Sequence, residues 1–249
     1  ITRQQLARKP LLTLLEESGL TLGKAQQNVS ARLADAVVAE FVAQTNRFPE
    51  WFPRWNIAPT TTISIVVTTE SGERVVGPAR WSLVPAWSKE LTLKFPTFNA
   101  RSETAAEKPT FRGSVNSHRC IVPISAYYEW TSVSGSKAPH LIHRPDWPLV
   151  GLAGLYSWWC SPDTGERIAT ATILTRDSAG ILTTIHDRMP IALEPQDHDR
   201  WLDPSKGDGA ALIAEVSETA AHTADHWDHY EVSPLRGDGP HLGERKREQ

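Results

Sequence analysis

The sequence predicts an α+β fold: a single domain, residues 1–249, with a twisted, barrel-like, mainly antiparallel β-sheet flanked by helices. Three observations lead to this prediction. Short segments typical of strands fill the middle of the chain, helical periodicity marks its beginning, and short helical segments return toward its end. A length of 249 residues suits one sizeable core, and neither a long linker nor an internal repeat divides it.

The first part of the chain is predicted to be helical. Its apolar residues recur at four-residue spacing, at Val29, Leu33, Val37 and Phe41. Ser30 could cap this helix. An earlier helix-like stretch spans residues 4–17, and Pro10 must begin or break it.

Strand patterns dominate from residue 61 onward. The predicted strands are residues 63–67, 75–83, 119–123, 126–130, 149–158 and 168–175. Turns are predicted at Gly72, at Gly135 and at residues 163–165. Short helices are predicted at 177–182, 196–202 and 210–214, and residues 237–249 are expected to form a frayed tail.

Composition excludes several classes of protein. The chain has 40% hydrophobic and 22% charged residues and ten Trp, which indicates a globular rather than a disordered protein. No apolar run approaches the roughly 18 residues that a membrane helix needs, and the start lacks the pattern of a signal peptide. Because Cys120 and Cys160 are the only cysteines, reduced thiols are expected in a soluble, cytoplasmic protein.

Charge is distributed unevenly along the chain. The net charge of −3 argues by itself against a polyanionic partner. However, residues 74–119 hold eight Lys and Arg against three acidic residues, whereas residues 194–231 hold ten acidic residues against two basic ones. This asymmetry suits a protein that presents one basic face to a polyanion. Alternatively, both runs form ordinary solvated surface.

Three polar segments follow strand-like patterns, at residues 99–104, 127–130 and 185–190. Glu129 lies in an aromatic run, where desolvation would raise its pKa and prepare it for proton transfer, unless strand alternation turns it to solvent. His186 could act as an acid or a base, or as a structural hydrogen-bonding group. Asn99 could orient an oxygen atom, or could serve as a turn residue or helix cap.

Several side chains suit a nucleic acid. The candidate phosphate ligands are Arg80, Arg101, Arg119 and Arg188, because a guanidinium group matches phosphate oxygens in a bidentate geometry. Trp81 and Trp87 could stack on bases, although core packing is the alternative for any one of ten Trp.

One competing arrangement suggests a metal site. His222, His226 and His229 alternate with Asp225 and Asp228 at a spacing that resembles a set of metal ligands. The sequence contains no Gly-rich phosphate loop, nucleophile-elbow Ser or Cys-x-x-Cys pair. We predict that the protein uses neither a metal nor another cofactor.

A series of blocks along the chain resembles one known family. The blocks are residues 54–60 (RWNIAPT), 80–87 (RWSLVPAW), 99–112 (NARSETAAEKPTFR), 119–123 (RCIVP), 128–130 (YEW), 153–155 (AGL), 173–175 (ILT), 186–190 (HDRMP), 201–202 (WL) and 232–234 (VSP). Together and in this order they resemble the SOS-response-associated peptidase (SRAP) family of abasic-site processing proteins. The resemblance covers nearly the whole chain.

The resemblance implies covalent chemistry on abasic sugars in single-stranded DNA, as part of a DNA damage response. The family's nucleophile is a cysteine exposed by removal of the initiator methionine, and its amine and thiol condense with the sugar aldehyde to a thiazolidine. By motif, Glu129 would assist ring opening and proton transfer, His186 would move protons, and Asn99 would position the N-terminal residue or the sugar. The family also implies autopeptidase and lyase activities.

The same resemblance implies a DNA-binding set. Its members are Arg80, Trp81, Arg101, Thr175, Arg188 and Pro59. Arg101 and Arg188 would hold phosphates, with Thr175 beside them, while Trp81 and Pro59 would pack against bases that flank the lesion. The expected partner is single-stranded DNA with abasic sites, bound by a monomer associated with the nucleoid.

This chain departs from the family pattern at its start. It begins at Ile1 without the expected cysteine, so we expect a few residues upstream of Ile1. Cys120 matches an ordinary strand cysteine of the family. Ser82 and Ala126 replace family glycines, which affects the expected approach of the backbone to DNA. The alternative functions are a non-catalytic single-stranded-DNA binding module and a thiol hydrolase that uses Cys120 with His186.

Overall fold

Alternation of apolar and polar residues makes the segment after residue 61 a strand. In β2 (Thr62–Thr68), Ile63 and Ile65 are buried on one face and Val66 is buried on the other, while Thr62 is exposed at the start of the strand. The computed structural model describes residues 40–41, 43–47, 54–133 and 136–246. The other strands in these ranges are β1 (Thr45–Asn46), β3 (Arg74–Trp81), β4 (Asn99–Arg101), β5 (Arg119–Ile124), β6 (Ala126–Val133), β7 (Ser136–His143), β8 (Val150–Cys160), β9 (Arg167–Asp177), β10 (Arg188–Pro190), β11 (Ala192–Leu193) and β12 (Asp228–Glu231).

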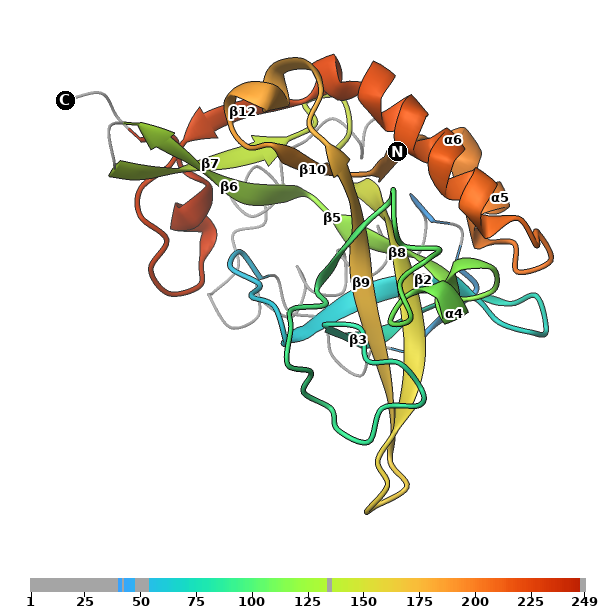
Figure 1. The fold of residues 1–249 in the computed structure, drawn as a ribbon. Helices are drawn as coiled ribbons and strands as arrows, with labels where there is room; N and C mark the ends of the chain where they lie inside the picture. The colour runs from blue at the N-terminus through green and yellow to red at the C-terminus, as the bar shows by residue number, and fades with distance from the viewer. Residues whose placement is uncertain (1–39, 42, 48–53, 134–135, 247–249) are drawn as a thin grey trace.

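Five of these strands close into a barrel-like sheet (Figure 1). Strands β3, β2, β5, β8 and β9 pair in this order and are antiparallel. Parallel pairing of β3 with β9, through Arg80 with Thr170 and Trp81 with Ala171, closes the ring. Strand β4 lies parallel to β9 and β10 lies antiparallel to it. The predicted barrel-like α+β fold is therefore confirmed.

A separate three-stranded sheet, in the order β12, β7, β6, lies beside the barrel (Figure 1). Its register places Glu129 opposite His140, and His140 opposite Glu231. Directly paired residues share one face of an antiparallel sheet, so these three side chains project from the same face. The small sheet therefore places three ionisable side chains, Glu129, His140 and Glu231, on one face beside the barrel.

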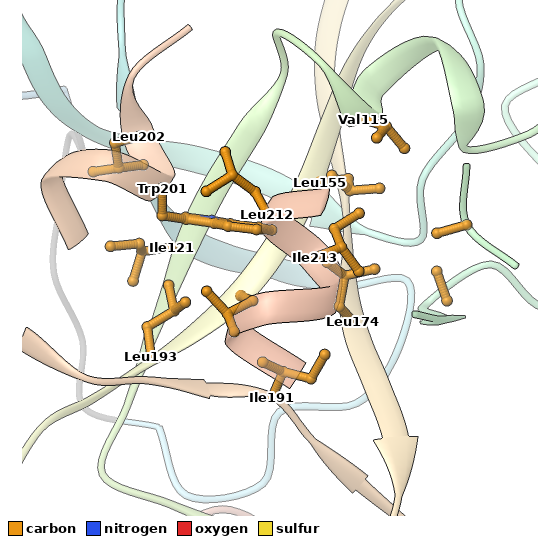
Figure 2. Close-up of a cluster of buried hydrophobic side chains, with 14 of the residues drawn as sticks. Val115, Ile121, Leu155, Leu174, Ile191, Leu193, Trp201, Leu202, Leu212 and Ile213 are labelled. Carbon is orange, nitrogen blue, oxygen red and sulfur yellow. The ribbon is translucent and has the colours of Figure 1, made fainter. Parts of the chain in front are cut away.

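The described helices are short apart from one of 14 residues. They are α4 (Arg112–Val115), α5 (His198–Leu202), α6 (Gly209–His222) and the 3-10 helices η1 (Gly180–Thr184), η2 (Pro195–Asp197), η3 (Ala224–His226) and η4 (Pro240–Gly243). Figure 2 shows Trp201 of α5 and Leu212 of α6 packed against Ile121 of β5 and Leu155 of β8. Burial of such apolar surface is the main stabilising contribution.

Close packing explains a glycine in the centre of β8. A β-carbon at Gly154 would lie 2.8 Å from Sγ of Cys120 and 2.9 Å from the carbonyl oxygen of Thr172. Gly154 pairs with Cys120 on one side and with Ile173 on the other. Only glycine lets β8 approach both neighbouring strands this closely.

The strand predictions agree with the structure, and the omissions lie in short or polar segments. Strands β7 and β12 contain His, Pro and acidic residues and lack a clear apolar alternation, so periodicity missed them. Helix α6 is longer than the predicted 210–214, and residues 177–182 are divided between β9 and η1. The predicted N-terminal helices fall almost entirely outside the described residues, as does the turn at Gly135.

The expected frayed tail is instead attached to the rest of the fold as far as residue 246. Asp238 accepts hydrogen bonds from the backbone N–H groups of Trp55 (2.7 Å) and Asn56 (3.2 Å). Lys246 forms an ion pair with Glu231 of β12 at 2.5 Å. No helix in the described part of the chain is both long enough and apolar enough to cross a membrane.

Candidate functional site

Glu129 lies on β6 with its side chain on the packed face of the small sheet. Tyr127, two residues earlier and therefore on the same face, packs edge-on against Trp227 with ring centroids 5.5 Å apart. Burial raises the pKa of the Glu129 carboxyl, while His186 acts in the opposite direction and Asp187 adds to the increase. The residue is therefore half-buried and within electrostatic reach of His186, in contrast to the solvent-facing alternative.

His186 lies in the loop between η1 and β10. Its backbone N–H donates to the carbonyl of Leu182 at 3.2 Å, and its Nδ1 accepts a 3.0 Å hydrogen bond from the backbone N–H of Arg188. Oδ1 of Asp187 lies 3.1 Å from the same Nδ1. The carbonyl oxygen of Arg188 lies 3.2 Å from Nδ1 as well, so these contacts orient the imidazole through Nδ1.

Asn99 is the exposed first residue of β4 and pairs with Ile173 of β9. The carbonyl of Phe98, directly before it, accepts hydrogen bonds from the backbone N–H of Ile173 at 3.0 Å and from Nε1 of Trp81 at 2.8 Å. Glu129 and His186 lie close enough for the histidine to lower the pKa of the Glu129 carboxyl. The structure connects Asn99 to His186 through the neighbouring strands β4, β9 and β10.

Arg188 is the most extensively bound of the predicted site residues. Its guanidinium contacts both carboxylate oxygens of Glu103, at 3.0 and 2.9 Å, and Oδ1 of Asp177 at 2.5 Å. It also donates to the carbonyl of Thr175 at 2.7 Å and lies 3.3 Å from the Thr175 hydroxyl. Arg188 therefore already has protein partners for most of its donors. Glu103 was missed as a site residue although it stands in the NARSET block, and no pattern singled out Asp177 as a partner of Arg188.

The other predicted DNA contacts lie on the strands around β9. Arg101 is exposed at the end of β4, opposite Thr175, which is itself buried. Trp81 is half-buried at the end of β3 and packs edge-on against Phe98.

Two predicted contacts lie at or beside the turn before β2. Arg80 is half-buried and donates to the carbonyl of Thr60, which has a positive φ of 72°. Pro59 is half-buried beside this turn. Trp87, in contrast, is 67% exposed in the loop that follows β3.

Arg119 was predicted as a candidate phosphate ligand, and this prediction is wrong. Its side chain is buried, and its guanidinium donates to backbone carbonyls, including those of Trp201 at 2.8 Å and Val115 at 2.9 Å. A further correction concerns the basic run. Arg74 of this run forms a 2.8 Å ion pair with Asp199, so residues 74–119 do not form one continuous free basic face.

The described residues support neither a thiol hydrolase based on Cys120 nor a metal site. Cys120 is fully buried, and burial raises the pKa of its thiol far above the ordinary value, which excludes the thiolate that a hydrolase needs. No group of three or more His, Cys, Asp or Glu in the described ranges is arranged to hold a metal ion.

The three histidines of the suggested metal site have different neighbours. His222 pairs with Glu218 at 3.6 Å, and Nδ1 of His226 lies 3.2 Å from Arg144. Nδ1 of His229 lies 3.3 Å from Nδ1 of His140.

Comparisons with known proteins match both the sequence and the fold of this chain. The family model described as SOS response associated peptidase (SRAP) matches residues 21–236. Abasic site processing protein YoqW of Bacillus subtilis is 36% identical over 187 residues, which cover 75% of this chain and 81% of YoqW. Abasic site processing protein HMCES of Gallus gallus is 29% identical over 232 residues, with 77% of this chain and 68% of HMCES covered. A crystal structure of a Bacteroides thetaiotaomicron protein matches with a TM-score of 0.70 at 26% identity, over 86% of this chain and 96% of that one.

Proposed function

Because the chain belongs to the SOS response associated peptidase family, we propose that it binds abasic sites in single-stranded DNA and forms a covalent DNA–protein crosslink there, as part of a DNA damage response. Relatives named abasic site processing proteins support the DNA substrate. The nucleophile of this proposal is a cysteine with a free α-amine, upstream of Ile1. The same cysteine would release the initiator methionine by self-processing.

The observation that carries the proposal is the half-buried Glu129 carboxylate, whose pKa is raised by burial and lowered by His186. Glu129 lies on β6 of the small sheet, and His186 lies in the loop before β10 of the barrel sheet. A carboxyl group with a raised pKa holds a proton closer to neutral pH, so it can donate that proton to the ring oxygen of the closed sugar. Proton donation there favours the open-chain aldehyde, which is the form that reacts with amines.

The covalent steps need proton transfers but no cofactor. The α-amine adds to the aldehyde carbon and water leaves, which forms an imine that a lyase reaction could also use. The thiol sulfur then adds to the imine carbon, and the nitrogen takes up the thiol proton to complete a thiazolidine. Glu129 and Nε2 of His186 would carry the protons, and Asn99 would position the N-terminal residue or the sugar.

DNA binding is assigned to the residues around β3, β4 and β9. Arg101 is exposed and suits a backbone phosphate, with the buried Thr175 directly opposite and Arg188 beside it. Arg80 borders the same strands. Trp81 and Pro59 would pack against the bases next to the lesion.

The test uses protein that carries the upstream cysteine and a labelled single-stranded oligonucleotide with one abasic site. The proposal expects a slower band on a denaturing gel and an intact mass equal to protein plus DNA minus one water. An oligonucleotide with a tetrahydrofuran in place of the abasic sugar has no aldehyde and serves as the control. Absence of the adduct with retained DNA binding would instead establish the non-catalytic binding module.

A further inference from the structure

Arg188 connects two segments that each carry a proposed catalytic residue. On one side it binds Glu103 in a bidentate ion pair, with distances of 3.0 and 2.9 Å. Glu103 lies four residues after Asn99 in the sequence. On the other side, the backbone N–H of Arg188 donates to Nδ1 of His186 at 3.0 Å. One residue therefore contacts both the segment that follows Asn99 and the imidazole of His186.

The same connection continues through Thr175 of β9. Its carbonyl accepts hydrogen bonds from the Arg188 guanidinium at 2.7 Å and from the backbone N–H of Ser102 at 2.8 Å. The Arg188 side chain is only 16% exposed, whereas Glu103 is 47% exposed. The bidentate geometry defines the orientation of the arginine more closely than a single contact would.

From these contacts we propose that Glu103 is a positioning residue: its ion pair with Arg188 holds the His186 imidazole and the Asn99 segment in their working arrangement. This inference rests on the proposed function. Exposed ion pairs contribute little to the free energy of unfolding, so the main effect of this pair is on the positions of the two segments. A small displacement of either segment would separate the proton-transfer group from the residue that positions the substrate.

Asp177 provides a matched comparison within the same cluster. It contacts the same guanidinium through one oxygen at 2.5 Å, yet its side chain is 81% exposed. Its carboxylate can move into solvent and leave that edge of Arg188 to a DNA phosphate. Glu103, with two parallel contacts, is the partner that orients the arginine. The two carboxylates carry the same charge and differ in how firmly they hold Arg188.

The experiment compares Glu103→Gln with Asp177→Asn in protein that carries the upstream cysteine. The rate constant of adduct formation at saturating abasic DNA is expected to fall about tenfold in Glu103→Gln, as lost positioning lowers the rate of the covalent step. The DNA concentration at half-saturation is expected to stay within about twofold, while Asp177→Asn keeps the wild-type rate. An unchanged rate in Glu103→Gln, or an equal loss in both variants, overturns the inference.

A second readout is independent of catalysis. Hydrogen exchange of the Arg188 backbone amide reports its bond to His186. It is expected to accelerate in Glu103→Gln and to stay unchanged in Asp177→Asn. If wild-type protein forms no adduct, the proposed function fails, and amide exchange still decides whether Glu103 holds this segment. Equal exchange in Glu103→Gln and wild type overturns the inference even when the adduct forms.

Discussion

The indole Nε1 of Trp81 donates a 2.8 Å hydrogen bond to the carbonyl of Phe98, the residue directly before Asn99. The two rings also pack edge-on, with centroids 6.0 Å apart. A residue assigned to base packing therefore also holds the strand that presents Asn99. In the proposed function, Trp81 would thus connect base packing to the position of Asn99.

Substitution of Trp81 by Phe should separate these two roles. Phe keeps an aromatic ring and loses the hydrogen bond, so we expect DNA affinity to change by less than about threefold while the rate of adduct formation falls several-fold. Trp81→Ala should reduce both. Trp158→Phe, on the 43% exposed Trp158, is the control. Affinity is measured by fluorescence anisotropy and the rate by gel. A wild-type rate in Trp81→Phe would contradict the link to Asn99.

Glu129→Gln should slow adduct formation and stabilise the fold. A lost general acid or base costs about 10²- to 10⁴-fold in rate. The pKa of the Glu129 carboxyl is higher in the folded state than in the unfolded state. Protonated Glu129 therefore favours the folded state. This stabilisation is fully present below the pKa of the unfolded state and is lost as the pH rises through the pKa of the folded state. Gln avoids that loss, and thermal unfolding scans should show a higher midpoint for the variant at pH 7 and no gain below about pH 4.

Glu231→Gln is the matched control for this prediction. Glu231 pairs with His140 on the same face of the small sheet as Glu129, but a hydrogen bond from Lys246 lowers the pKa of Glu231. Ionised Glu231 therefore favours the folded state, and its contribution to the free energy of unfolding has the opposite pH dependence. This variant should lose stability at neutral pH and keep the wild-type rate. The proton-transfer role of Glu129 is wrong if Glu129→Gln reacts as fast as Glu231→Gln.

Arg101→Ala should weaken DNA binding in a salt-dependent way. Loss of one phosphate contact lowers the slope of log affinity against log salt concentration by about one. Arg167→Ala is the control, because Arg167 stacks on Trp158 at 5.1 Å in the β8–β9 hairpin. Titrations at four salt concentrations provide the slopes. Equal slopes for wild type and Arg101→Ala would remove Arg101 from the interface.

Arg119→Met should destabilise the protein without a direct effect on DNA binding. The buried guanidinium satisfies backbone carbonyls from α4 and α5, and its removal leaves them unpaired. We expect a loss of about 3 kcal/mol in the free energy of unfolding, measured by urea denaturation. A normal unfolding midpoint combined with weak DNA binding would contradict this structural role.

Cys120→Ala should leave adduct formation unchanged. The thiol is buried, and burial raises its pKa, so it supplies no thiolate in the folded protein. Iodoacetamide should alkylate the exposed Cys160 in the native protein and reach Cys120 only after denaturation. Mass spectrometry distinguishes the two sites. Loss of the adduct in a folded Cys120→Ala variant would restore the thiol-hydrolase alternative.

Sequence alone predicted the strands that are rich in apolar and β-branched residues and bounded by turn residues, namely β2, β5, β8 and β9. Burial is nearly continuous along β5, β8 and β9, as in strands covered on both faces. The ordered blocks determined the family and identified Asn99, Glu129 and His186 as candidates. Charge counts did not show that two arginines of the basic run have protein partners: Arg74 pairs with Asp199, and the buried Arg119 donates to backbone carbonyls.

Only the tertiary structure decided how these candidates are arranged. Register on the small sheet places Glu129 on the packed face, and burial then raises its pKa. The contacts of Arg188 with Glu103 and Asp177 join residues that are 85 and 11 positions apart. These contacts form only when the strands pair in the observed order and the barrel closes. Pairing between strands that are distant in the sequence cannot be deduced from a local pattern of residues.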